Sequence, residues 1–543
     1  MSELEISKEI SNRFLVLGIS GIITIGFFIR FLYFPYDVPI SLDASYYFSY
    51  AYEIAKEGRF PENFILANNG WPTFLSLFFK TLGTNEFQTF VDLQRTLSIV
   101  ISVATIIPMY FLCRNFFSKI ISVIGGALLI LEPRIISNSI LGITEPLFNF
   151  LIITSLVLFF TKTKLFYVSF IILALAVIIR YEALVIIIPF SIMFFIRSKK
   201  DDKKIFRYIL CLGIFILILC PMAMIRIDTM GSDGIVSHVY GGINAVSKYA
   251  IQGTPLDSPD VDDFPGEQNT FRLHNFLSVG FSSMFFSLGL IQIPVFILFF
   301  PLGILLVIKK DKLKNMNYKH VTLILFVIFA SLTMLYAHGR GIMEIRYYLI
   351  LYPIIVLICC IVIQRINQRI RNKTMLVLIL GFIIIATFVY LEYKKIDYEF
   401  EREAFEITSI ATNISDKINA GSLHGSYITT ASMIEKWPEI KRPPEAKMAK
   451  FSPYTACKFD LEIGEVCKFG SDSLEEFISK GKENGLDHIV VDSRDHGPKY
   501  IQDIFLNEKK YSYLDKVFDS KEEGYSYHVK IFWINFEKFE GVD

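Results

Sequence analysis

Charged residues are scarce in this sequence of 543 residues, and so are cysteine and tryptophan. Asp, Glu, Lys and Arg make up 20% of the chain, which contains 7 Cys and 3 Trp. So few cysteines exclude a disulfide scaffold, and so little charge in a hydrophobic chain excludes a disordered one. The formal net charge is only +1. The basic clusters fit the loops of a membrane protein, so a nucleic-acid binder is excluded as well.

Hydrophobic residues are abundant instead, at 53% of the chain, with 51 Phe and a mean hydropathy of +0.46. The charged residues are unevenly spread: 57 lie in residues 1–391, about 15% of that part, and 50 lie in residues 392–543, about 33%. A change of this size marks a domain boundary. The sequence therefore predicts a membrane domain over 1–391 followed by a soluble domain over 392–543.

Long apolar runs fill the first domain. Because lipid cannot hydrogen-bond the backbone, an apolar run of about 20 residues is typical of a transmembrane helix. About eleven such runs are present. They lie near 14–34, 95–112, 119–132, 143–160, 165–179, 183–196, 205–226, 283–308, 320–336, 346–363 and 374–391. The predicted fold is a polytopic α-helical membrane protein with a C-terminal α/β domain.

The basic residues test this count independently, because loops on the cytoplasmic side of a membrane are rich in Lys and Arg. With the amino terminus in the cytoplasm, five short loops on that side carry 19 Lys and Arg. A single span over 165–196 would place basic clusters on both sides, so two passes are predicted there. The same alternation places the long loops at 35–94 and 227–282 on the outer face of the cell membrane. Because the number of spans is odd, residues 392–543 are predicted on that face as well.

The outer domain has the pattern of a small α/β fold that follows a charged helix over 392–409. Apolar periodicity predicts two helices and two strands. They are the helices 473–484 and 500–507 and the strands 488–492 and 529–534. Cys457 and Cys467 lie ten residues apart. Because disulfides form outside the cytoplasm, this topology predicts a disulfide between them.

The first outer loop contains two segments with the pattern of amphipathic helices. The first runs from Ala44 to Ala55 and carries four tyrosines, a residue type that anchors helices at headgroup depth. These are Tyr46, Tyr47, Tyr50 and Tyr52. The second segment runs from Trp71 to Phe79. The chain is therefore expected to build structure on the outer surface of the membrane.

Acids and arginines gather near the outer ends of the predicted spans, and hardly any charge lies at mid-span. Charged groups at membrane depth are costly and are usually functional. The residues concerned are Asp37, Asp43, Arg95, Glu132, Arg134, Glu145, Arg180, Glu182, Arg226, His338, Arg340, Glu344 and Arg346. Their convergence on one face predicts a site for an anionic, membrane-borne substrate.

Several of these residues lie in five short motifs. They are Ser41-Leu42-Asp43-Ala44-Ser45-Tyr46-Tyr47, Glu132-Pro133-Arg134, Thr144-Glu145-Pro146-Leu147-Phe148, Arg180-Tyr181-Glu182, and Arg346-Tyr347-Tyr348 with Pro353. These motifs resemble those of the GT-C superfamily of polyprenyl-phosphate-sugar glycosyltransferases. The resemblance covers roughly residues 10–390 and is greatest to the protein O-mannosyltransferase and aminoarabinose-transferase branch, archaeal dolichyl-phosphate-mannose mannosyltransferases included. It implies transfer of a sugar, such as mannose, from a polyprenyl or dolichyl phosphate to a protein, glycan or lipid acceptor.

In that family an Asp of the first outer loop is the catalytic base, and the resemblance carries this role over to Asp43. A carboxylate there can take a proton from the acceptor as it attacks the anomeric carbon. The leaving polyprenyl phosphate needs cations, and arginine suits bidentate contact with phosphate. Arg346 is the first choice for this contact, and Arg340, Arg180 and His338 follow it.

Four further residues are expected to bind the acceptor or to orient other groups. They are Glu145, Glu182, Arg134 and Glu132. Some members of the family bind a divalent ion near Glu145 and others do not, so a metal is left open. The residue after Asp43 is Ala and not a second acid, which speaks against a paired-acid metal site in the first loop.

Each of these roles has a structural alternative. Asp43 is also a favoured residue for capping the helix that follows it. Arg180 and Glu182 could form an interfacial ion pair that stabilises a hairpin, and Arg346 could anchor at the headgroups. Glu145, which precedes a proline, also fits a helix start.

Two other functions remain open. An oligosaccharyltransferase would carry a Trp-Trp-Asp acceptor signature, whereas Trp71, Trp437 and Trp533 are not adjacent to one another. A transporter or flippase of lipid-linked sugars would place polar groups near the bilayer midplane on repeated, broken helices. The sequence shows neither clear repeats nor mid-span charges, so the glycosyltransferase is the leading hypothesis.

Overall fold

The structure is a computed structural model. It describes residues 12–36, 40, 42–62, 64, 66, 68–83, 87–199, 201–247, 273–308, 317–339, 342, 344–370, 373–394, 406, 410, 423–426, 455–460, 464–470, 473–483, 486–493 and 499–541. Up to residue 394 the described chain is helical, and from residue 423 it forms a six-stranded sheet with short helices. The predicted charged helix over 392–409 lies almost entirely outside the described residues.

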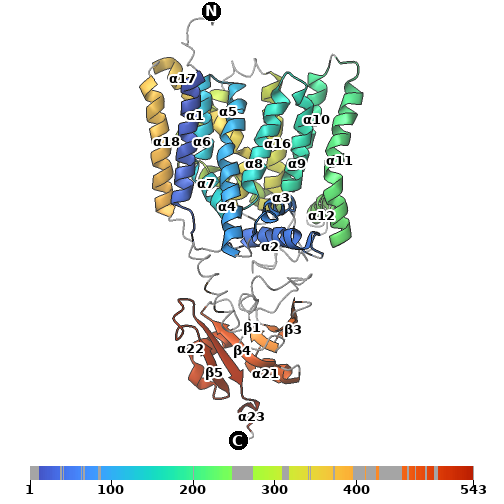
Figure 1. Ribbon diagram of the computed structural model, residues 1–543, viewed down its shortest axis with the longest axis vertical. Coiled ribbons are helices and arrows are strands. Elements are labelled where there is room, and N and C mark those ends of the chain that lie inside the picture. The colour runs from blue at the N-terminus through green and yellow to red at the C-terminus, as the bar shows by residue number, and fades with distance from the viewer. Residues whose placement is uncertain are drawn as a thin grey trace, which may run out of the picture.

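The long helices of the first part run side by side and form a bundle (Figure 1). They are α1 (Asn12–Leu32), α4 (Phe87–Ala104), α5 (Ile106–Arg114), α6 (Lys119–Ile130), α8 (Glu145–Phe160), α9 (Leu165–Ile179), α10 (Ile187–Arg197), α11 (Lys204–Met230), α16 (Tyr318–Gly339), α17 (Tyr352–Ile370) and α18 (Lys373–Lys394). In the part of the chain that the structure describes, six helical segments are long and apolar enough to cross a membrane. The number rises to seven if the bent pair α6 and α7 (Pro133–Leu141) counts as one span. The chain is a multi-pass membrane protein, and the count of eleven spans stays a prediction.

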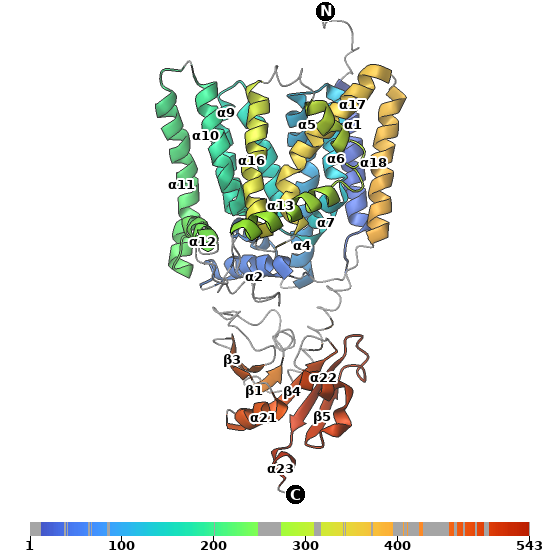
Figure 2. The ribbon, with the colours of Figure 1, turned by 180° about the vertical axis from the view of Figure 1, so that it is seen from behind.

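The predicted span over 283–308 is interrupted. Helix α13 (Leu273–Leu290) ends within the predicted span. Residues 291–299 then form turns, and α14 (Phe300–Ile308) follows them. Figure 2 shows α13 lying across the bundle rather than along it. Pro294 lies within the interruption, and proline cannot donate the backbone hydrogen bond that a continuous helix requires. The prediction of one helix over 283–308 is therefore wrong.

The break predicted between residues 179 and 183 is confirmed. Helix α9 ends at Ile179, Arg180 has an extended backbone with φ of −150°, and the 3-10 helix η1 (Tyr181–Ile186) leads into α10. An extended residue ends the helical hydrogen-bond ladder, so the side chain of Arg180 projects from a turn between two helices. Helices α8 and α9 pack against each other, and α11 packs against α9.

The amphipathic segments of the first outer loop are helices, as predicted, but most of their aromatic residues are buried. Helix α2 (Leu42–Glu57) packs on α3 (Gly70–Phe79). Tyr47 and Tyr50 are 6% and 1% exposed, whereas Tyr46 is 45% exposed. The predicted role of these tyrosines as headgroup anchors is therefore wrong for Tyr47 and Tyr50, because α2 turns this face toward a core that it shares with α3 and the start of α4.

The two ends of the bundle differ. Helices α2, α3 and α12 (Val236–Ser247) lie at the end that faces the C-terminal sheet, and the connections from α10 to α11 and from α17 to α18 lie at the opposite end (Figure 1). The predicted outer elements thus share one end and two of the predicted basic loops share the other. This arrangement agrees with the alternation deduced from the basic residues; which end faces the cytoplasm stays a prediction.

The C-terminal part forms one sheet with the strand order β3-β2-β1-β4-β6-β5, in which β1 and β4 are parallel and the other neighbours antiparallel. Its elements are β1 (Leu423–Ser426), β2 (Thr455–Asp460), β3 (Gly464–Gly470), α21 (Leu474–Glu483), β4 (Leu486–Asp492), α22 (Lys499–Leu506), η4 (Glu508–Lys510), β5 (Leu514–Asp519), β6 (Val529–Ile534) and α23 (Phe536–Phe539). Both predicted helices and both predicted strands are confirmed. Helices α21 and α22 cover β4 through a core that includes Phe477 and Ile504.

The backbones of Cys457 and Cys467 lie opposite each other on the antiparallel strands β2 and β3. Directly opposed residues of such strands have Cα atoms about 4.5–5.5 Å apart, within the range that a disulfide bridges. The backbone register is thus compatible with the predicted disulfide, which stays a prediction.

Candidate active site

Asp43 lies in the first turn of α2, at the end of the bundle that faces the C-terminal sheet (Figure 1). Its carboxylate pairs with the guanidinium of Arg346, which lies 303 residues later in the 3-10 helix η3 (Ile345–Leu351). Arg346 also pairs with Glu344. The side chains of these three residues are between 29% and 47% exposed. The first outer loop therefore meets the connection between α16 and α17 in one direct, solvent-accessible ion pair.

A second acid–arginine group lies deeper beside the first. Arg180 pairs with Glu145, the first residue of α8, and donates from Nη2 and Nε to Oε1 of Glu182 at 2.6 and 3.1 Å. The side chains of Arg180 and Glu145 are only 7% and 3% exposed. The Arg180 guanidinium also lies 5.8 Å from the ring centroids of Phe148 and Tyr347. Arg180 is thus held on several sides by charge and by aromatic faces.

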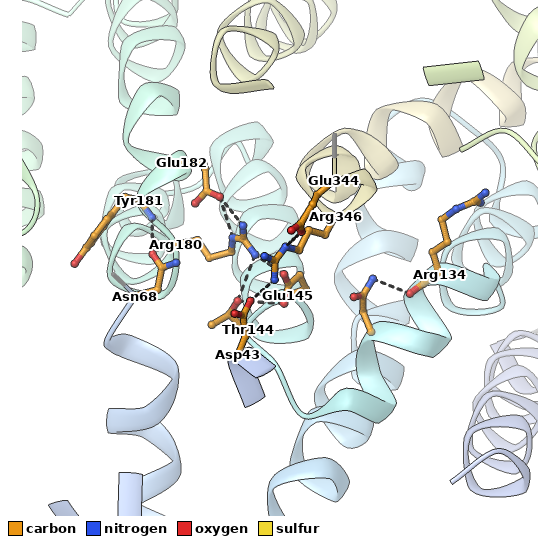
Figure 3. Close-up of polar contacts among 11 residues, drawn as sticks. Asp43, Asn68, Arg134, Thr144, Glu145, Arg180, Tyr181, Glu182, Glu344 and Arg346 are labelled. Atoms are coloured by element: carbon orange, nitrogen blue, oxygen red, sulfur yellow. Dashed lines mark hydrogen bonds and ion pairs between the residues drawn. The ribbon is translucent and has the colours of Figure 1, made fainter. Parts of the chain in front are cut away.

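Tyr47 and Thr144 connect the two groups. Tyr47 follows Asp43 by one helical turn of α2 and shares a hydrogen bond with Thr144, whose hydroxyl donates to Glu145 at 3.1 Å. Burial and the negative charges of Glu145 and Asp43 raise the pKa of Tyr47 far above its usual value, although Arg180 opposes this. Tyr47 therefore keeps its proton at physiological pH. Figure 3 shows Asp43, Glu145, Arg180 and Arg346 pointing toward one another.

His338 lies in a separate group. It is fully buried at the end of α16, where Nδ1 is 2.7 Å from Oγ of Ser283 and Nε2 is 2.9 Å from the hydroxyl of Tyr348. That hydroxyl donates to the carbonyl of Met284 at 2.9 Å, so Nε2 of His338 carries the proton and Nδ1 accepts from Ser283. The imidazole joins α13, α16 and η3. Arg340 lies outside the described residues.

Arg134 lies apart from the acid–arginine groups (Figure 3) and pairs with Glu132 at 2.9 Å. The Glu132 carboxylate caps α7 by accepting from the backbone N–H groups of Arg134 and Ile135 at 2.8 and 3.0 Å. The Arg134 guanidinium donates to the carbonyls of Leu290 and Ile293 at 2.8 and 2.7 Å. The pair fastens the end of α13 to α7. Their predicted part in binding the acceptor has no support in these contacts.

Two buried arginines differ from the sequence-based expectation, one in its position along a helix and the other in its structural role. Arg95 was expected at the start of a span, but the helical segment begins at Gln88 and Arg95 lies inside it, 1% exposed. Arg30 was not singled out, yet it is fully buried in α1 and donates to Ser102, Ser139 and the carbonyl of Ile130, each at 2.9 Å. A lone arginine close to the end of an apolar run was the available signal for Arg30.

Comparison of the sequence with protein-family models gives no match, and comparison with curated proteins gives none either. Solved structures do resemble the chain. Oligosaccharyltransferase AglB from Archaeoglobus fulgidus, in complex with an inhibitory peptide and a dolichol-phosphate, aligns over 96% of this chain and 74% of its own, at 12% identity and a TM-score of 0.52. ArnT from Cupriavidus metallidurans, bound to undecaprenyl phosphate, aligns over 96% of this chain and 98% of its own, at 11% identity and a TM-score of 0.51.

Both of these proteins are GT-C glycosyltransferases. This chain has the GT-C fold. The GT-C resemblance found in the sequence motifs is thereby confirmed for the architecture. At 11% and 12% identity the likeness shows the fold alone, and the chain spans only 55% of the archaeal enzyme in another of its structures. The activity therefore has to be argued from the site.

The acids of this GT-C chain alternate with arginines. Arg346 stands between Asp43 and Glu344, and Arg180 stands between Glu145 and Glu182. Within the described part of the chain, no three His, Cys, Asp or Glu side chains gather so that they could hold a metal ion.

Proposed function

We propose that this chain is an inverting glycosyltransferase that moves a sugar from a polyprenyl-phosphate or dolichyl-phosphate carrier to an acceptor at the outer face of the membrane. The observation that carries the proposal is the Asp43–Arg346 ion pair beside the Arg180–Glu145 pair. It places a carboxylate and two guanidinium groups together at one end of a membrane bundle. An enzyme that deprotonates an acceptor and releases a lipid phosphate needs this combination.

Asp43 is proposed as the general base. As the acceptor attacks the anomeric carbon, the Asp43 carboxylate takes its proton, and the bond between that carbon and the phosphate oxygen breaks. The phosphate leaves with the bonding electrons on the face opposite to the attack, so the configuration inverts. Such a base contributes about 10²–10⁴-fold in rate. The position of Asp43 in the first turn of α2, 42% exposed, lets an acceptor reach it.

Arg346 is proposed to hold the phosphate. Its guanidinium is partly exposed and is bound to two carboxylates that are more exposed still, so a phosphate oxygen can replace one of them. Arginine binds phosphate through two parallel hydrogen bonds, which stabilise the charge that grows on the leaving group. The exchange also frees Asp43 for the acceptor. We therefore expect the donor to bind before the acceptor.

Arg180 and Glu145 are proposed to form the buried side of the site. Arg180 is too deeply buried and too fully bonded to move readily, since it contacts two carboxylates and two aromatic rings. It places a fixed positive charge beside the Asp43–Arg346 pair. Preorganised charge of this kind stabilises a developing negative charge without reorganisation during the reaction.

The acceptor class is left to experiment. AglB, with a peptide in its complex, and ArnT share the fold, so the fold fits protein, glycan and lipid acceptors alike. The sheet domain after residue 394 faces the end of the bundle that carries Asp43 (Figure 1), and we propose that it covers the site or recruits the acceptor. A lipid-linked-sugar transporter is disfavoured, because the acid–arginine groups gather at one end and not at the midplane.

The test is a transfer assay with purified protein and a panel of polyprenyl-phosphate and dolichyl-phosphate sugars. Asp43→Asn keeps the size and polarity of the side chain and removes the base, so sugar transfer should fall at least 100-fold while the thermal unfolding temperature stays near that of the wild type. Undiminished transfer by a folded Asp43→Asn variant would remove Asp43 from the mechanism. Absence of transfer from every donor by the wild type would reject the proposed function.

A further inference from the structure

One backbone carbonyl near the site accepts two side-chain hydrogen bonds. The carbonyl of Gly142 accepts from Nε1 of Trp71 at 2.9 Å and from Nε2 of Gln94 at 2.8 Å. Trp71 comes from α3 and Gln94 from the middle of α4, and both are fully buried. Two separate elements therefore fix the loop that leads from α7 to Glu145.

The same amide of Gln94 also reaches the first outer loop. Nε2 donates to the carbonyl of Ala44 at 3.1 Å, and Ala44 directly follows Asp43. Both contacts of the Gln94 amide are carbonyl oxygens, so its NH₂ group must face them, which fixes the orientation of the amide. One buried side chain therefore holds the residue after Asp43 and the loop before Glu145 at the same point.

The backbone conformation of Gly142 and its lack of a side chain both favour the contact with Gln94. It ends α7 in the left-handed region with φ of 77°, a conformation that favours glycine. A Cβ atom there would lie 3.0 Å from Cγ of Gln94, so a larger residue would push the glutamine away. Glycine at position 142 thus allows both the turn at the end of α7 and the close approach of Gln94.

We propose that Gln94 is a positioning residue that sets the distance between Asp43 and the Glu145–Arg180 pair. The inference rests on the proposed function, in which these groups act on one donor sugar. Gln94 itself is fully buried and touches neither substrate. Its two hydrogen bonds join α2 to the loop before α8, so their loss lets the base move relative to the fixed positive charge. A displacement of about 1 Å at a catalytic group can cost roughly 100-fold in rate.

The test compares Gln94→Met with Gln88→Met. Methionine approximates the length of glutamine and cannot donate, so Gln94→Met removes both hydrogen bonds with little change in volume. Gln88 lies on the same helix, and its amide donates to Asp92 at 3.0 Å within that helix, so Gln88→Met is a matched control. We expect kcat to fall about 10–100-fold in Gln94→Met, with little change in the KM for the lipid-phosphate donor. The control should keep both constants.

Hydrogen exchange supplies a readout that does not need activity. Loss of the two bonds should speed amide exchange in the first turn of α2 and in residues 142–145 in Gln94→Met but not in Gln88→Met. Unchanged exchange would overturn the proposed contact, even if the wild type transfers no sugar. Faster exchange with an unchanged kcat would show that Gln94 holds the loops without positioning the base, and would also overturn the proposal. A Trp71→Phe variant, which removes only one donor to Gly142, should change kcat less and in the same direction.

Discussion

The arginines of the acid–arginine groups and two other arginines of the bundle, Arg30 and Arg134, are held by different sets of partners. Arg346 and Arg180 face carboxylates. Arg30 faces the hydroxyls of Ser102 and Ser139 and backbone carbonyls. Arg134 donates to carbonyls beside the end of α13 and also pairs with the fully buried Glu132. The exposed carboxylates beside Arg346 can be exchanged for another anion, whereas the buried arginines hold parts of the bundle together.

The chemistry of the partners explains this separation. A carboxylate that is 40% or more exposed, as Asp43 and Glu344 are, loses little when a phosphate takes its place, because water can solvate it. A backbone carbonyl or a hydroxyl buried in a membrane protein has no such replacement, and leaving it unpaired costs about 1–3 kcal/mol. Arg346 is therefore suited to binding an anion, and the buried arginines to stability.

The largest expected effect tests whether Arg346 binds the phosphate of the donor. Arg346→Gln removes the charge that we assign to the phosphate, so kcat/KM for the lipid-phosphate donor should fall about 100–1,000-fold. Steady-state kinetics with one donor sugar measures it. The matched control is Arg207→Gln, since Arg207 also pairs with an aspartate, Asp201, and is exposed at the other end of the bundle. A similar loss in both variants would mean that the end of the bundle that carries Arg346 has no special role.

The next-largest expected effect tests whether the buried Arg30 stabilises the helix bundle. Arg30→Met leaves the hydroxyls of Ser102 and Ser139 and the carbonyl of Ile130 without their donor, and we expect a loss of about 1–3 kcal/mol in stability. Thermal unfolding in detergent, followed by tryptophan fluorescence, measures the loss. Transfer per folded molecule should stay within about threefold of the wild type. A large loss of activity at an unchanged unfolding temperature would place Arg30 in the functional group instead.

The architecture was largely predictable from the sequence because it depends on local signals. Long apolar runs, basic loops and the two periodicities located the main helices, the break at Arg180 and the helices and strands around β4 and β6. Of the site, the sequence supplied Asp43, Glu145, Arg180, Glu182 and Arg346, because acids and arginines beside apolar runs are rare. Each of these residues lies in one of the two adjacent groups.

The pairing of these residues could not be predicted, because it depends on how helices far apart in the sequence pack. No local pattern shows that Arg346 meets Asp43, 303 residues away. Nor does a pattern show that Arg134 meets the carbonyls of Leu290 and Ile293. The roles of Tyr47 and Gln94 were missed for the same reason: an aromatic residue or an amide in an amphipathic helix looks alike whether it faces lipid, water or a catalytic loop.

The smallest expected effect extends the comparison to the C-terminal sheet, where one buried carboxylate accepts several hydrogen bonds. Asp519 at the end of β5 accepts from Nζ of Lys516 at 3.2 Å, from the backbone N–H of Lys521 at 3.1 Å and from Nε2 of His528 at 2.8 Å. Although burial opposes the shift, these donors lower the pKa of Asp519 below its ordinary value of 3.8. Because the folded pKa is lowered, the stabilisation is fully present above pH 3.8 and is lost as the pH falls through the folded value.

Hydrogen exchange of β5 and β6 between pH 6 and pH 3, corrected for the intrinsic exchange rate, checks this expectation. Protection should fall at the acid end in the wild type. Asp519→Asn should be less protected at pH 6 and change less on acidification, because it has no carboxylate to protonate. Asp515→Asn is the control on the same strand, since the nearest cation to Asp515, Lys538, lies 3.6 Å away on the surface. If Asp519→Asn keeps the pH dependence of the wild type, another group governs the acid response of the sheet.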